Sequence, residues 1–172
     1  TTYAGTGGGG STGDLGPATA ATFTPYFMTV AGKGDLYIGD TAGFRVRRIV
    51  AATGLIETIA NEGVIGGIAV DPAGNLYWGS TGIVRRYDAV TGLVSTFWGF
   101  AEPSRVAVDG DGTVYIARGN SISVVSGGGL TPVATSVDGN GGLAVRSGTL
   151  FYAGNPEPRV HMRLAVDGTV LN

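Results

Sequence analysis

One side chain in this sequence could act as a general base or a metal ligand near neutral pH, and that is His161, the only histidine. His161 follows a valine in a short apolar segment, as Arg47 and Arg85 do in two similar segments. This shared position indicates a polar site on a repeated β-strand, so we expect His161 to be dispensable for function. Nucleophilic catalysis lacks support as well, because no acid and histidine set accompanies any serine.

Two glycine-containing motifs are similar to ion-binding loops but lack their decisive residues. Asp109 and Asp111 match the first ligands of a calcium loop, which needs a bidentate Glu at its twelfth position, where this chain has Asn120. We therefore expect a plain hairpin turn at residues 109–112. Gly7 to Gly10 is not followed by the Lys-Ser/Thr pair of a phosphate-binding loop, so we expect a flexible loop. Without cysteine, thiolate metal sites and disulfides are excluded, and we predict no metal and no cofactor.

Charge and hydropathy argue against two further classes of partner. The 172 residues carry a net charge of −2, and no basic face emerges that would bind a nucleic acid. No run of eighteen apolar residues is present, so we expect no membrane insertion. Hydrophobic residues make up 43% of the chain, enough to bury the core of one domain. Because the chain starts at Thr1 rather than Met, we expect a mature form or an excised piece.

A fourfold repeat is the strongest pattern in the sequence. Each unit has a glycine, a small polar residue, an aliphatic residue and an aromatic residue. The aromatics are spaced by 40, 38 and 36 residues, and they are Tyr37, Tyr77, Tyr115 and Phe151. Short runs rich in Val, Ile, Tyr and Thr flank each unit and are separated by turn residues, which is typical of β-strands. Four antiparallel strands in a repeat of about 40 residues predict one blade of a β-propeller.

The predicted fold class is therefore all-β, a β-propeller of four antiparallel four-stranded blades. We also expect one short helix at residues 17–23 that lies over the edge of the first blade, with Phe23 directed inward. The expected boundaries are a closing or exchanged strand at 1–5, a Gly-rich loop and short helix at 6–24, and blades at 25–60, 61–100, 101–135 and 136–172.

These repeats resemble NHL-repeat propellers of the bacterial secreted type. The match is closest in the first blade, where residues 34–41 read GDLYIGDT and residues 45–49 read RVRRI. Residues 68–77 read IAVDPAGNLY, and residues 13–21 resemble a connection between blades, whereas the third and fourth blades lack the paired arginines. The resemblance implies the fold over nearly the whole chain and an extracellular or cell-surface location. It implies no single function, because this fold hosts binding modules, scaffolds and a few enzymes.

The mouth of the central axis is the default ligand site of a propeller. Tyr26, Phe27 and Arg105 enter the innermost strands there, and Tyr26 and Arg105 would suit a small anionic ligand. A carbohydrate is a further candidate. Gly66-Gly67 and Gly141-Gly142 enter the same strands in the other two blades and should let backbones crowd the axis.

Two arginine pairs, Arg47-Arg48 and Arg85-Arg86, alternate with apolar neighbours. We expect them to stack and to pair with carboxylates such as Asp40, Asp71 and Asp88. The alternative is a basic surface stripe for an anionic partner.

The two ends of the chain look like parts of one strand. Residues 1–4 match residues 57–60, the last strand of the first blade, and residues 168–170 match the start of that strand. The closure strand that we predict beside residues 160–166 consists of Thr1, Thr2, Tyr3 and Ala4 with Val170 and Leu171. The pairing could close the ring in one molecule or complete a neighbouring subunit and so form a polymer. The chain could also be part of a longer array or half of an eight-bladed dimer; we favour exchange slightly, because residues 5–13 form a long flexible arm.

Two classes of function remain. The first is a non-catalytic extracellular scaffold or binding propeller whose partner is a protein, including itself. The second is a propeller hydrolase or lyase similar to gluconolactonases, with a small-molecule site at the central mouth. Propellers of that second type place acids around a central calcium, whereas the Glu residues here fall outside the innermost strands, and NHL-like lyases rely on histidines that this chain cannot supply. We therefore expect no enzymatic activity.

Overall fold

The computed structural model describes residues 1–63, 66–99, 105–126, 128–135, 141–153, 160–164 and 170–171. It contains four antiparallel sheets of four strands each, which confirms the predicted all-β blades. The first two blades consist of β1 (Pro25–Val30), β2 (Leu36–Asp40), β3 (Arg45–Ile49) and β4 (Ile56–Ala60), and of β5 (Ile68–Val70), β6 (Leu76–Ser80), β7 (Ile83–Tyr87) and β8 (Val94–Trp98). The last two consist of β9 (Arg105–Val108), β10 (Val114–Arg118), β11 (Ser121–Ser126) and β12 (Gly129–Thr135), and of β13 (Leu143–Arg146), β14 (Thr149–Ala153), β15 (Val160–Leu164) and β16 (Val170–Leu171).

Each blade begins with a tight hairpin whose glycine marks the sequence repeat. The backbone φ is 93° at Gly34 and Gly74, 88° at Gly112 and 73° at Gly148. A side chain is strained at these angles, so glycine closes the turn between the first two strands at little cost. In the third blade the amide of Gly112 donates to the carbonyl of Asp109 at 3.0 Å, which confirms the hairpin expected at residues 109–112.

Apolar side chains fill the space between each blade and the next. Tyr37 and Val46 of the first blade pack with Leu76 and Trp78 of the second. Two similar clusters join the second blade to the third and the third to the fourth. The core is therefore divided into layers between sheets, each about as thick as the side chains of two facing sheets.

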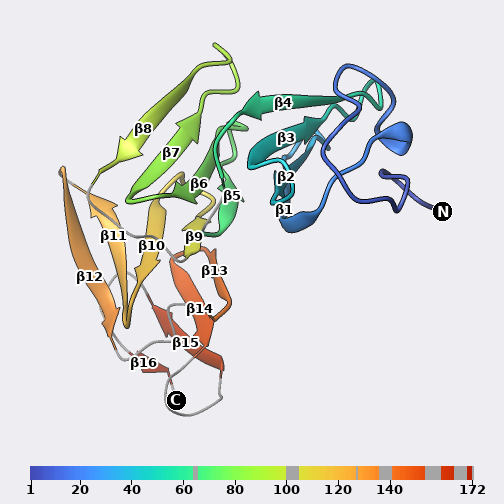
Figure 1. Ribbon diagram of the computed structural model, residues 1–172. Helices are drawn as coiled ribbons and strands as arrows, with labels where there is room; N and C mark the ends of the chain where they lie inside the picture. Colours follow the sequence, from blue (N-terminus) through green and yellow to red (C-terminus); the bar gives the residue numbers. More distant parts are fainter. Residues whose placement is uncertain are drawn as a thin grey trace.

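The four blades follow one another around an arc (Figure 1). The innermost strands are in contact in sequence order, β1 with β5, β5 with β9 and β9 with β13. The first blade, in blue and teal, and the last blade, in orange and red, lie at opposite ends of this arc (Figure 1). The N-terminus lies beside the first blade, and β16 is the outer strand of the last blade.

The segment before β1 covers the face of the first blade that is turned away from the second. Its helical part is a single 3-10 turn, Ala18–Ala20, which is shorter than the helix predicted at residues 17–23. Ala18 and Ala21 are fully buried against Ile38, Ile49 and Ile56, and the half-buried Phe23 packs on the same cluster. The expected position over the first blade is thus confirmed.

Candidate functional site

The predicted axial residues meet where β1 and β9 begin. The guanidinium carbon of Arg105 lies 5.4 Å from the centre of the Phe27 ring, a cation–π distance. The ring of Tyr26 packs edge-on against Phe27, with 4.8 Å between centroids. The three side chains therefore form one cluster, although they come from the first and third blades.

Glycine is required at one of the two axial glycine pairs. A Cβ on Gly67 would lie 3.0 Å from the backbone nitrogen of Val106 and 3.3 Å from the Cα of Arg105, so β5 approaches β9 closely there. A Cβ added at Gly142 would lie in open space. The close approach of backbones that we predicted at this glycine is therefore not present.

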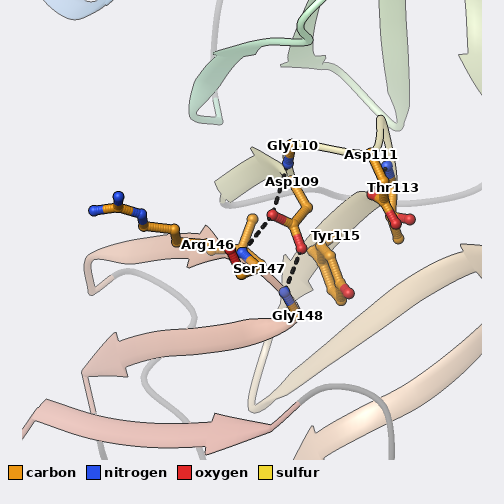
Figure 2. Close-up of a pocket in the computed structure, with 9 residues that line it drawn as sticks. Asp109, Gly110, Asp111, Thr113, Tyr115, Arg146, Ser147 and Gly148 are labelled. Carbon is orange, nitrogen blue, oxygen red and sulfur yellow. Dashed lines mark hydrogen bonds between the residues drawn. The ribbon is translucent and has the colours of Figure 1, made fainter.

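A hollow of about 750 Å³ lies between the third and fourth blades. Figure 2 shows Asp109 pointing across it toward the turn at Ser147 and Gly148. The Asp109 carboxylate accepts hydrogen bonds from the backbone amides of Gly110 at 2.6 Å, Ser147 at 2.8 Å and Gly148 at 2.6 Å. Because Asp109 is 5% exposed and already holds three donors, it links two blades and has little capacity left for a ligand.

The second carboxylate at this hollow, that of Asp111, bonds within its own turn. The Asp111 carboxylate accepts the amide of Thr113 at 2.8 Å, and this backbone bond lowers the pKa of Asp111. Burial, with the nearby charges of Asp109 and Asp111, raises the pKa of Tyr115, so its hydroxyl stays protonated at neutral pH. The hollow therefore lacks a group poised for proton transfer near pH 7.

A second hollow, of about 420 Å³, lies between the first and second blades. Arg48 lines it and is paired with Glu57 at 2.6 Å and Asp35 at 3.9 Å. Burial raises the pKa of Tyr37 beside it, although Arg48 opposes the shift. Lys33 lies on the rim and is exposed.

The arginine pairs contact two of the three aspartates that were predicted to be their partners. Arg47 lies 3.8 Å from Asp40, and Arg86 lies 2.9 Å from Asp88. Asp71 differs, because its carboxylate accepts from the backbone and side chain of Asn75 and, at 3.3 Å, from the hydroxyl of Tyr77. Because carboxylates lie beside these arginines, their positive charges are balanced locally. The contacts therefore do not favour the alternative, a basic surface stripe.

The N-terminal segment is held by Arg47, a role that sequence reasoning missed. This fully buried guanidinium donates to the carbonyls of Thr12 and Thr22, both at 3.0 Å, and to the carboxylate of Asp14. Asp14 also accepts from Thr58 at 2.7 Å. Two of the acceptors are backbone carbonyls, which leave no signal in the sequence.

The predicted closure strand is not formed within the single chain. The amide of Gly5 donates to the carbonyl of Ala18 at 2.8 Å, and Ala4 packs on the apolar cluster of the first blade. At the other end of the arc β16 pairs with β15, with Leu171 opposite Met162 and Val170 opposite Arg163. Val170 and Leu171 therefore take the outer position of the fourth blade. The prediction that Thr1 to Ala4 take this position in the same molecule, and so close the ring, is wrong. Exchange between molecules stays a prediction.

His161 lies on β15, opposite Tyr152, at the strand position that the repeat predicts. Among the residues that the structure describes, no three His, Cys, Asp or Glu side chains gather in a way that could hold a metal ion. No helix in these described ranges is long and apolar enough to cross a membrane.

Solved structures with the same arrangement of blades identify the fold. Virginiamycin B lyase from Staphylococcus aureus is similar with a TM-score of 0.65 and 15% identity, over 84% of this chain and 53% of that one. A protein of unknown function from Bacteroides thetaiotaomicron gives 0.71 and 16%, over 94% and 46%. The fold is a β-propeller. A chain of the nidogen/laminin complex, at 0.61 and 13% over 80% and 58%, supports the same conclusion.

The likeness extends to the fold alone. No family model and no curated protein sequence matches the chain. The resemblance to NHL repeats therefore remains a prediction from the motifs. The chain spans about half the length of the propellers that it matches.

Proposed function

We propose that this propeller is a non-catalytic binding module and structural scaffold that acts outside the cell or at its surface, with protein as its partner. One contrast carries the proposal. The most buried carboxylates, those of Asp40, Asp71 and Asp109, accept hydrogen bonds from the chain itself. Large apolar side chains of β1, in contrast, are exposed: Tyr26 by 72% and Met28 by 61%.

Exposed apolar groups on an ordered strand favour a protein partner. Contiguous apolar patches on soluble proteins generally mark interaction sites. A propeller is also present in the nidogen/laminin complex, a protein assembly, although its low identity transfers no partner to this chain. The resemblance to secreted NHL proteins is what supports an extracellular location.

Self-assembly is part of the proposal. In a strand-exchange route, Thr1 to Ala4 of one copy would pair along β15 of another. Among the described residues, β16 pairs with two residues of β15, and this short pairing supports a route in which a longer strand takes that edge. The packing of Ala4 on the first blade opposes this route, because the arm must be released first.

The competing class is a hydrolase or lyase with a small-molecule site at the central mouth. The cluster of Tyr26, Phe27 and Arg105 is the feature that favours it. Metal analysis of the purified chain, combined with turnover assays on a panel of lactones, separates the two classes. We expect no stoichiometric metal and no turnover; one bound calcium or zinc per chain, or turnover that Arg105→Met abolishes, would contradict the proposal.

A further inference from the structure

The exposed side chains of β1 occupy positions that are covered in every other blade. Val30 corresponds to Val70, Val108 and Val145 in the repeats, and Met28 corresponds to Ile68, Val106 and Leu143. In the three later blades, both positions pack on the preceding blade. In the first blade they are exposed, Met28 by 61% and Val30 by 60%.

The N-terminal segment covers only part of this face. Met28 is paired with Ile38, and Val30 with Leu36, so these four side chains share one face of the sheet. The segment packs on Ile38 and Leu36 but leaves the β1 side chains exposed. We call Tyr26, Met28 and Val30 the β1 stripe.

The fourth blade has the opposite deficit. Tyr37, Tyr77 and Tyr115 each pack against the following blade and are 2%, 5% and 5% exposed. The equivalent Phe151 is 37% exposed and lies opposite Ala144, which is also exposed. Both line an apolar hollow of about 320 Å³ on the last blade.

We propose that a second copy of this chain covers both faces, with the fourth blade of each copy packed on the β1 stripe of the other, so that two arcs close into one ring of eight blades. The inference rests on the proposed function and names its partner. The repeat itself shows the fit, because the Phe151 position packs on the Met28 and Val30 positions at each blade junction within the chain. The fourth blade of the same molecule cannot provide this contact, since it lies at the far end of the arc (Figure 1).

Two further observations favour a second copy. The chain covers 46–58% of the solved propellers that it matches, so two arcs supply about the number of blades in a complete propeller. A net charge of −2 per chain produces little repulsion between copies. The arrangement is two-fold symmetric with two identical junctions, and it is closed, so it does not lead to filaments.

Sedimentation velocity of the full chain tests the ring, and we expect a dimer of twice 17.3 kDa. Met28→Lys places a charge in the junction and should weaken association by roughly tenfold or more. Val90→Lys is the matched control, because Val90 is 91% exposed on the turn between β7 and β8. A monomeric wild type, or equal dimerisation of the two variants with unchanged circular dichroism, would overturn the inference.

Cross-linking tests the same junction without relying on a disruptive substitution. The chain has no cysteine, so Met28→Cys and Phe151→Cys each introduce a single reactive thiol. A short bis-maleimide should cross-link a mixture of the two variants and leave each variant alone mostly uncross-linked. Cross-links of equal yield in the separate variants would contradict the ring.

Deletion of residues 1–3 distinguishes ring closure from strand exchange. The ring predicts that the dimer persists, whereas loss of association would assign it to the exchanged strand and overturn the ring. A monomer that also lacks metal and turnover would remove this inference and the self-assembly part of the proposal, while leaving the non-catalytic binding function intact.

Discussion

Replacement of Arg47 by methionine should release the N-terminal segment from the first blade. The buried guanidinium binds Asp14 and the carbonyls of Thr12 and Thr22, and lies 3.8 Å from the buried Asp40. Removing one partner of a buried ion pair generally costs about 3–5 kcal/mol, because the other charge stays buried without compensation. That is a large part of the total stability of about 5–15 kcal/mol that is usual for a domain.

Urea unfolding, followed by the fluorescence of the buried Trp78, measures the effect. With a slope of about 1–3 kcal/mol per molar urea, the midpoint for Arg47→Met should fall by roughly 1–5 M. Arg45→Met is the control, since Arg45 is one-third exposed and touches Asp14 once, at 3.4 Å. Such a surface pair contributes about 0–1 kcal/mol. Equal midpoints for the two variants would refute the role given to Arg47.

Three more variants test separate parts of the account. Burial alone would raise the pKa of Asp14, but the hydrogen bond from Thr58 and the charge of Arg47 outweigh it and hold this pKa below 3.8. The ionised Asp14 therefore contributes stability above its unfolded pKa, and this contribution is lost as the pH falls through the folded pKa. Asp14→Asn should weaken the fall in the free energy of unfolding that acid causes below about pH 4. Urea titrations that show the same fall in both proteins would be inconsistent with this. Asp109→Ala leaves buried amides without an acceptor and should cost about 1–3 kcal/mol in thermal unfolding, whereas a neutral result would contradict its linking role. His161→Gln should keep wild-type folding and binding, and a folded variant that loses function would disprove the structural interpretation.

The blades could be predicted from sequence because their determinants are local. Gly34 and its three equivalents are needed for a positive φ at the first hairpin of each blade, so the requirement is written at a fixed repeat position. The apolar residues that follow alternate between the two faces of a strand, and this period of two is also visible in the sequence.

The position of the N-terminus could not be predicted in the same way. Residues 1–4 resemble the last strand of a blade, but such a pattern indicates only that the segment can form a β-strand. It does not indicate which sheet edge the segment pairs with. The decisive contacts are from Arg47 to the carbonyls of Thr12 and Thr22, and every residue carries a carbonyl. The role of Asp109 in linking two blades was missed for the same reason, because its partners in the fourth blade are the backbone amides of Ser147 and Gly148.

Native mass spectrometry of the unmodified chain tests the central claim most directly, because one spectrum reports both assembly and bound metal. A non-catalytic scaffold that closes into a ring predicts one species at twice 17.3 kDa without a retained metal ion. A species that carries one metal ion per chain would contradict the scaffold function, and a monomer or an open ladder of oligomers would contradict the ring.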